Sequence, residues 1–522
     1  MQINKVCVLG GGTAGFFVSS LLEKYKEISK INFEIIQVHN PKMEKIGVGE
    51  STLLQINDFF SYLDLKDEDW MKECDATYKT SIRFEDFYKL GTHFHYPFGK
   101  IHQRDSNYGQ LWFTLKDKYP DIFTQDTIAR YLIPSTYLNE ENKLTEKCDE
   151  LLFNLNSQSA YHFDSHKLAN FLEKRLRNKD VIIIEDEYIS SKKDKDGNIK
   201  SIVCENNIID ADLFIDCSGF KSLLLGKELN EKYIDFNNTL INNRVIRTKF
   251  PYKNKNQQLK NYTNCVALKN GWCWEIPLWD GISVGYVHST KFENKDEILK
   301  EFKNHCKKYK DDFDVDYKII DYKTGRYERG WANNVVAVGL SYGFLEPLES
   351  TGIASLLVNC FRLIEVLSKR DMFISNVDKD VFNYAVGVGN LDVLKNFIEM
   401  HYYLSSRTDS DYWKHVTQKI NYDSENLDSE YRKFLHKTVI MRDYIGNECE
   451  TGYPFIIGGM NYSPYSKAYV LKEEHNKFLE DRKNIFLEEE IEINKLLSSI
   501  PSTYEFLNEK IYNHDHFDFI NN

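Results

Sequence analysis

Residues 347–357, PLESTGIASLL, place a carboxylate (Glu349), two hydroxyls (Ser350 and Thr351) and a glycine (Gly352) ahead of an apolar run that could open a helix. The first amides of a helix have no intrahelical acceptor and attract anions. A carboxylate beside such amides could serve chemistry on a bound anion. The plain alternative is that Glu349 is a helix N-terminal charge that gains about 0.3 to 1 kcal/mol from the helix dipole, with Ser350 or Thr351 as the cap.

A glycine-rich turn near the N-terminus indicates a dinucleotide site. An apolar strand at residues 3–9 leads into GGGTAG, then a helical run to about residue 24 and a second strand at residues 32–38. In this order of elements the helix N-terminus offers N–H groups to a pyrophosphate, although a glycine turn could also serve packing alone. The expected contacts are Gly10, Gly12, Thr13, Ala14 and Gly15.

The second strand lacks the acidic residue that usually holds a ribose hydroxyl in this fold. His39 or Asn40 stands there instead, and either side chain could form that hydrogen bond. We take His39 as the cofactor contact.

The remaining elements suggest how these motifs are positioned. Alternating patterns between about 180 and 300 predict an antiparallel sheet, and a buried strand ends at Asp216. From about 355 the chain reads as helical and charged. We expect a core over residues 1–370 with the inserted sheet, and a helical substrate-side region over 371–522.

Composition narrows the function classes. The 522 residues carry a net charge of -12, from 79 acidic and 67 basic residues, which disfavours nucleic acid and anionic membrane surfaces as partners. The ten cysteines form no C-x-x-C pair, and no apolar run approaches the roughly 20 residues of a membrane span. We therefore expect a cytoplasmic protein with small-molecule or protein partners and no membrane segment.

Five segments together resemble the flavin-dependent halogenases of the tryptophan-halogenase family. They are GGGTAG (10–15), IGVGEST (46–52), GWCWEIP (271–277), GFLEPLESTGI (343–353) and HYYLSSRTDSDYW (401–413). The W-x-W-x-I-P signature within the third is the most specific. The resemblance implies an α/β fold with an FAD-binding Rossmann-like domain of the GR2 monooxygenase-like type.

The resemblance also implies a reaction. FAD in its reduced form, supplied by a separate flavin reductase, would react with O2, and a halide bound by the amides of Thr351 and Gly352 would be oxidised to hypohalous acid. By match of CDATYK to the family's lysine segment, Lys79 would hydrogen-bond hypohalous acid or form a haloamine, so that an electrophilic halogen meets an electron-rich aromatic ring. Glu349 would act on the substrate side, where it would stabilise the ring cation or take its proton. The plain reading of Lys79 is a solvated lysine.

Other family positions are carried over in the same way. Trp272 and Trp274 share one face of a strand and would keep organic substrate away from the flavin, together with Ser350, although the two indoles could be core only. Further flavin contacts would come from Gly47, Val48, Gly49, Glu50, Ser51, Asp216, Gly339 and Phe344.

The substrate wall matches the family only in part. Phe98 and Tyr96 in the early segment, and Tyr453 in the later one, are candidate substrate contacts. Residues 435–449, LHKTVIMRDYIGNEC, lack the aromatic and acidic clamp of tryptophan-specific members. We expect an indole, phenol or heteroarene substrate rather than strictly free tryptophan, and chloride, bromide or iodide as the halide.

Two rival functions remain on sequence grounds: a flavin monooxygenase or other FAD oxidoreductase on the same fold, and a non-catalytic FAD-binding scaffold. The histidine pairs His93/His95 and His514/His516 lack partner clusters of cysteines or acids, so no metal is expected. The sequence leaves open whether the chain forms a homo-oligomer.

Overall fold

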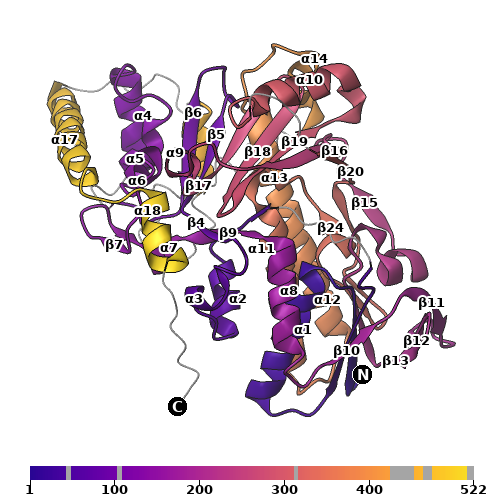
Figure 1. Cartoon of the computed structure of the whole chain (residues 1–522). Helices are drawn as coiled ribbons and strands as arrows, with labels where there is room; N and C mark the ends of the chain where they lie inside the picture. Colours follow the sequence, from indigo (N-terminus) through magenta and orange to yellow (C-terminus); the bar gives the residue numbers. More distant parts are fainter. Residues whose placement is uncertain (43–48, 103–107, 311–315, 424–451, 463–472, 514–522) are drawn as a thin grey trace, which may run out of the picture. The chain divides into compact units, whose positions relative to one another are not determined.

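The protein is described here by a computed structural model that covers residues 1–42, 49–102, 108–310, 316–423, 452–462 and 473–513. It consists of two compact units, each built from three separate stretches of chain (Figure 1). The first unit contains Met1–Ala76, Tyr161–Asn243 and Ile320–Lys395; the second contains Thr77–Ala160, Arg244–Ile319 and Asn396–Asn522. Residue 370, the boundary expected from sequence, falls inside the first unit.

A six-stranded sheet is the centre of the first unit. Its strands lie in the order β10 (Ile182–Glu185), β2 (Glu34–His39), β1 (Lys5–Leu9), β14 (Leu213–Asp216), β23 (Val335–Ala337) and β22 (Trp331–Ala332). All neighbours are parallel except β22 and β23. The apolar residues of β1 are buried, as expected for a parallel sheet covered on both faces. The Rossmann-like fold predicted from the glycine turn is confirmed.

Helices of the first unit pack on one another beside this sheet. The glycine turn leads into α1, which contacts both α8 and α11, and α11 in turn contacts α12. Their bounds are α1 (Thr13–Ser29), α2 (Ile56–Tyr62), α3 (Asp67–Trp70), α8 (Ser165–Leu176), α11 (Thr351–Ser368) and α12 (Asn376–Val386).

Smaller sheets complete the first unit. They contain β3 (Gly49–Ser51) with β9 (Ala160–Asp164), then β11 (Tyr188–Lys193), β12 (Ile199–Cys204) and β13 (Ile208–Asp210), and finally β15 (Tyr233–Asp235), β21 (Gly325–Tyr327) and β24 (Gly343–Phe344). The single antiparallel sheet expected between 180 and 300 is thus too simple. Its first strand, β10, joins the parallel sheet beside β2, and only the part after residue 243 builds the large antiparallel sheet.

The second unit is organised on that larger sheet. Its strands run β16 (Arg244–Phe250), β19 (Gly281–His288), β18 (Gly271–Leu278), β17 (Tyr262–Leu268), β5 (Ser81–Glu85) and β6 (His93–Pro97), with β20 (Lys318–Asp321) at the β16 edge. These six strands pair antiparallel except β17 with β5. A core that includes Phe250, Cys273, Tyr286 and Phe302 joins this sheet to α10 (Lys295–Cys306). Strand β18, which carries the GWCWEIP motif, is therefore a central strand that pairs with a neighbour on each side.

The C-terminal part of the chain is mostly helical where it is described, as the sequence predicted. The second unit contains α4 (Tyr108–Lys118), α5 (Thr127–Leu132), α6 (Thr136–Glu140), α14 (Asp411–Val416), α16 (Gly452–Gly459), α17 (Glu473–Leu497), α18 (Thr503–Leu507) and most of α13 (Asp392–Tyr403). Helix α16 packs against β6 and α5.

Helix α11 is long and apolar enough, by length and composition alone, to cross a membrane, with a mean hydropathy of 1.4 over 18 residues. Its buried share is 56%, and it packs against α1 and α12. These contacts are those of a core helix, and such helices pass the same test.

Candidate active site

The glycine turn between β1 and α1 has the shape that a dinucleotide requires. Gly10 has a φ of 135°, and a Cβ there would collide with the backbone carbonyl of Cys217. The Gly10 N–H donates to the Val38 carbonyl at 2.8 Å. A Cβ on Gly12 would meet nothing within 4 Å. The residues present therefore fit FAD, because open space lies in front of the first amides of the 17-residue helix α1.

Of the other predicted cofactor residues, Gly339 lies beside the start of α1 and Thr13 belongs to it. A Cβ built on Gly339 would lie 3.2 Å from Cβ of Ala14, and the Gly339 N–H donates to the Asn359 side chain at 3.2 Å. Thr13 Oγ1 donates to the Ser165 carbonyl at 3.4 Å. Phe344 is half-buried between the rings of Phe220 and Tyr322, with centroids 5.4 and 5.2 Å away.

Asp216 has a local structural task. Its fully buried carboxylate accepts hydrogen bonds from the Ser218 backbone (3.0 Å) and hydroxyl (2.5 Å), and from the amides of Leu224 (2.7 Å) and Leu225 (3.0 Å). Burial raises its pKa. Any contribution of Asp216 to cofactor binding would come through the loop that it orders at the end of β14.

The segment IGVGEST (46–52), predicted to contact the flavin, is described only in part. Gly47 and Val48 lie outside the described residues. Gly49, Glu50 and Ser51 form β3, which pairs with β9. Ser51 Oγ and Ser350 Oγ are hydrogen-bonded at 2.9 Å, both buried. The segment and the turn before α11, 299 residues apart in the chain, are thus brought together in the first unit.

Glu50 has an unusual ionisation. Burial, and secondly the charge of Asp164, raise its pKa to about 7. A carboxyl whose folded pKa is raised stabilises the fold below its unfolded pKa, and this stability is lost as pH rises through about 7. We expect Glu50→Gln to remove this loss of stability. The free energy of unfolding of the variant should then exceed that of wild type by up to about 3 kcal/mol at pH 8, and by little at pH 4. Urea unfolding at both pH values tests this, with the exposed Glu68→Gln as control; an equal gain at both would contradict it.

The turn before α11 is built as the sequence suggested. Pro347–Glu349 forms a short 3-10 turn, Ser350 has a left-handed φ of 57°, and α11 begins at Thr351. No side chain of the described residues caps this helix, and its first turn has no acidic residue. Gly352 is exposed, and a Cβ there would meet nothing within 4 Å. The first amides of a helix lack intrahelical acceptors, and the open space at Gly352 would let a small anion approach them.

Filling this space should weaken halide binding. We expect Gly352→Val to raise the KM for halide about tenfold with FAD affinity unchanged, because the side chain would occupy the space in front of the helix dipole. Steady-state rates at varied halide concentration test this. Gly389→Ala, an exposed glycine whose Cβ would make an ordinary contact, is the control and should leave the halide KM at the wild-type value.

Two carboxylates flank the turn, and the structure gives them different surroundings. Glu346 is fully buried, and Asn242 Nδ2 donates to its Oε2 at 2.6 Å. Glu349 is 1% exposed and closes the 3-10 turn directly before Ser350. The two acids therefore differ in place: Glu346 ties the turn to the Asn242 segment, while Glu349 is the one adjacent to the helix start.

Lys79 lies in the second unit, at the end of β4 (Thr77–Lys79), and is completely buried. Thr77 Oγ1 donates to the Pro277 carbonyl at 2.7 Å, and the Thr80 N–H donates to the Asn261 carbonyl at 2.7 Å. The lysine backbone is thus fixed on both sides. Lysine side chains are almost never fully buried, so such a position has a specific reason.

The predicted substrate residues lie beside this lysine. Lys79 Nζ is 5.0 Å from the ring centroid of Phe98, whose N–H donates to the Thr80 carbonyl. Tyr96 contacts Phe98 edge-on at 5.9 Å. Phe397 links Tyr96 to Tyr453 on α16, with ring centroids 6.2 and 4.9 Å away. Phe455 of the same helix α16 stacks on Tyr96 at 5.9 Å. The second unit therefore assembles a lysine and a wall of aromatic rings.

Trp272 and Trp274 lie on one face of β18, with ring centroids 6.3 Å apart, and both are buried. The ring of Trp274 lies over Gly285 of β19, where any Cβ would collide with it. Its Nε1 has no hydrogen-bond partner among the described residues. The two indoles share a face, as the sequence predicted; their role as a flavin shield remains a prediction.

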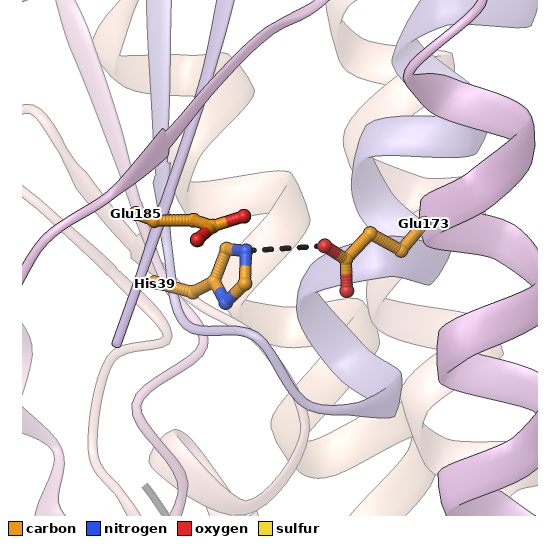
Figure 2. A group of neighbouring side chains, drawn as sticks. All are labelled: His39, Glu173 and Glu185. Atoms are coloured by element: carbon orange, nitrogen blue, oxygen red, sulfur yellow. Dashed lines mark ion pairs between the residues drawn. The ribbon is translucent and has the colours of Figure 1, made fainter. Parts of the chain in front are cut away.

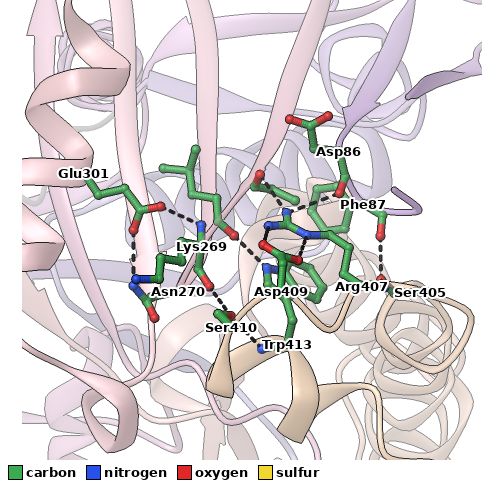
Figure 3. A network of polar contacts seen from close by, with 12 residues as sticks. Asp86, Phe87, Lys269, Asn270, Glu301, Ser405, Arg407, Asp409, Ser410 and Trp413 are labelled. Carbon is green, nitrogen blue, oxygen red and sulfur yellow. Dashed lines mark hydrogen bonds and ion pairs between the residues drawn. The ribbon is translucent and has the colours of Figure 1, made fainter. Parts of the chain in front are cut away.

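The end of β17, just before the turn into the tryptophan strand, is held by a clamp of Arg407, Asp409 and Trp413 (Figure 3). Arg407 is 4% exposed, pairs with Asp409 at 2.7 and 2.8 Å, and donates to the Ala267 carbonyl at 3.0 Å. Trp413 lies 4.5 Å from the guanidinium and donates its Nε1 proton to the Leu268 carbonyl at 2.7 Å. The family-like segment 401–413 thus fixes the end of β17.

Sequence reasoning missed the residues that hold the lysine in place. Asn139 donates to Thr80 Oγ1 (2.5 Å) and to the Asn261 side chain (3.2 Å), and Asn261 donates to the Lys143 carbonyl (2.8 Å). All but Lys143 are buried. Isolated asparagines carry no motif, so only their burial in the fold reveals this role.

Of the two histidine pairs, only His93/His95 lies among the described residues. His95 Nδ1 and Ser81 Oγ are hydrogen-bonded at 2.9 Å, and burial holds the pKa of His95 well below its usual value. His514 and His516 lie outside the described residues, as does segment 435–449.

Together these features are those of a flavin-dependent enzyme: the Rossmann-like fold, the glycine turn, a helix N-terminus suited to an anion, the buried lysine and the tryptophan strand. The tryptophan halogenase family model matches residues 5–468, so the chain belongs to the tryptophan halogenase family. It is a flavin-dependent halogenase that uses reduced FAD, O2 and halide and depends on a separate flavin reductase.

Similar proteins agree with this assignment. The chain is 31% identical to tryptophan 7-halogenase RebH of Lentzea aerocolonigenes over 79% of its length and 78% of that protein. The crystal structure of tryptophan 6-halogenase SttH from Streptomyces toxytricini matches with a TM-score of 0.80, 28% identity and 97% and 99% coverage. The apo structure of VirX1 matches with a TM-score of 0.88, 36% identity and 98% and 100% coverage.

Proposed function

We propose that the protein halogenates an electron-rich indole, phenol or heteroarene through Lys79, and that free tryptophan is not its strict substrate. The buried lysine beside the ring of Phe98 carries this proposal. An aromatic wall of Tyr96, Phe98 and Tyr453 suits a flat ring. Residues 435–449 lack the clamp expected for free tryptophan.

These positions support the following proposed roles for the residues. FAD, when bound, supplies the reducing equivalents that activate O2 for oxidation of the halide. The amides of Thr351 and Gly352 hold the halide. Lys79 donates a hydrogen bond to the hypohalous acid. The arene attacks the halogen, the halogen–oxygen bond breaks, and the leaving hydroxide takes the proton that Lys79 donates, giving water. Glu349 stabilises the ring cation and accepts the ring proton, which balances the proton given by Lys79.

Bromide and iodide should be used at least as readily as chloride. A site made of backbone amides discriminates these ions weakly, because it offers partial charges and no shape-fitted cage. The heavier halides are more easily oxidised. We propose bromination and iodination alongside chlorination.

The test is mass spectrometry of reactions with protein, FAD, a flavin reductase, NADH and O2. Chloride, bromide and iodide are supplied separately, each with tryptophan and with a panel of indoles and phenols. Halogenated panel products, with little from tryptophan, are expected. Oxygenated products that form without halide would instead support the flavin monooxygenase reading, and complete inactivity of the FAD-loaded protein across the panel would support a non-catalytic FAD-binding protein.

We further propose that the enzyme works in the cytoplasm with no membrane partner. Whether it forms a homo-oligomer is testable by light scattering of the FAD-loaded protein.

A further inference from the structure

The end of β2 lacks the carboxylate that dinucleotide-binding folds usually place there to hold a ribose hydroxyl. His39 occupies that position and is 4% exposed. Its imidazole stands directly beside the glycine turn, since a Cβ built on Gly11 would lie 2.7 Å from His39 Nδ1. Phe16 of α1 contacts the imidazole edge-on at 5.6 Å. The side chain is therefore fixed at the edge of the sheet where the adenosine half of FAD would lie.

A carboxylate reaches the same place from another element. Glu173, in the last turn of α8, lies with its Oε1 3.5 Å from His39 Nε2 (Figure 2). Its side chain is 15% exposed and that of His39 is 3% exposed, so the pair is largely shielded from water. Both residues belong to the first unit, as does the glycine turn.

The carboxylate of Glu173 is held in place by a second contact. Arg177, one helical turn further along, donates to Glu173 Oε1 at 2.6 Å and also pairs with Glu185. Glu185 ends β10 and is the register partner of His39. Three elements, β2, β10 and α8, thus converge on one small group of charged side chains.

We propose that Glu173 delivers from α8 the carboxylate that β2 lacks, and that Glu173 and His39 together bind the ribose hydroxyls of the adenosine half of FAD. A carboxylate accepts hydrogen bonds from two vicinal hydroxyls, and an imidazole nitrogen can bond the same groups. Arg177 orients the carboxylate without consuming all its acceptor positions, because each oxygen accepts more than one bond. The inference rests on FAD as cofactor and is independent of halogen transfer.

A divalent cation is the alternative occupant. One ligand atom from each of His39, Glu173 and Glu185 lies within 4.8 Å of the others. A cation would, however, compete with the Arg177 guanidinium, which already bonds both carboxylates. Two carboxylates paired to an arginine are better suited to accept neutral hydroxyl donors than to release the arginine for a metal.

The experiment is a flavin-fluorescence titration of apoprotein with FAD and with FAD analogues that lack the 2′- or the 3′-hydroxyl of the adenosine ribose. With wild type, at least one analogue should bind about tenfold more weakly than FAD, or weaker still, as expected for loss of a hydrogen bond to a charged group. Glu173→Gln should weaken the binding of FAD by a similar factor. The same substitution should weaken the binding of the discriminated analogue by no more than about twofold. Equal binding of FAD and both analogues by wild type would overturn the proposal, and this arm needs no variant that folds.

Glu185→Gln is the matched control, because Glu185 pairs with Arg177 as Glu173 does but has no role in ribose binding under the proposal. It should leave FAD affinity within about twofold of wild type, on the scale of an exposed ion pair. If instead Glu185→Gln and EDTA both weaken FAD binding, and added Mg²⁺ or Zn²⁺ restores it, a metal site replaces the proposal. Failure of wild type to bind FAD at all would contradict the cofactor assignment itself.

Discussion

Lys79→Ala is expected to abolish halogenated product, at least a hundredfold below wild type, while FAD binding stays intact. A preorganised donor in a water-excluded site contributes about 10²- to 10³-fold to the rate, and Lys79 would supply that donor to the halogen. All residues assigned to FAD lie in the first unit, whereas Lys79 lies in the second. Mass spectrometry of the product and a fluorescence titration of FAD give the two readouts.

Two further variants make the Lys79 result specific. Lys79→Met keeps much of the buried volume without the amine, and it should be as inactive as Lys79→Ala with less loss of stability. Lys72→Ala removes an exposed lysine seven residues earlier and should retain wild-type activity. Halogenation by Lys79→Met above about a tenth of the wild-type rate would remove the amine from the mechanism.

Glu349→Gln is expected to slow halogen transfer about a hundredfold, because general-base and electrostatic contributions of one carboxylate are of this size. The glutamine has the same shape and leaves the 3-10 turn intact, so FAD affinity and halide KM should change little. The slow step should appear in single-turnover reactions as accumulation of oxidised halide before product. A wild-type rate would end the catalytic assignment of this residue.

Glu346→Gln tests whether Glu346 has a catalytic or only a structural role. Glutamine can still accept the bond from Asn242, so this variant should keep most of its activity. Asn242→Ala leaves a buried carboxylate without that donor, and it should lower the free energy of unfolding by about 1 to 3 kcal/mol. If Glu346→Gln were the inactive variant and Glu349→Gln the active one, the two acids would have to exchange roles.

Motif-bearing parts of the fold were predictable from the sequence because local geometry determines them. The glycine turn requires a left-handed φ at Gly10 and open space at Gly12, so residue type and structure coincide there. The helix start at Thr351 and the shared face of Trp272 and Trp274 follow from periodicity in the same way.

Contacts between distant residues were not predictable. Nothing in the sequence pairs Ser51 with Ser350, or Asn139 with Thr80, because hydrogen bonds between side chains far apart in the chain leave no periodic trace. Strand β10 was assigned to the wrong sheet for a related reason: an apolar run predicts a strand but not its neighbour. The spacing of the fold's usual acid points to a residue directly after β2, so the sequence offers no reason to propose Glu173, which lies on α8.

The Arg407 clamp acts on the backbone carbonyls of Ala267 and Leu268, so it does not depend on which side chains the turn before β18 carries. These two hydrogen bonds involve none of the rings of Tyr96, Phe98 and Tyr453 that would face a substrate. Selection can alter those rings without releasing the strand. Such a scaffold permits substrate range to drift among descendants, and directed evolution could change the aromatic wall while leaving residues 401–413 untouched.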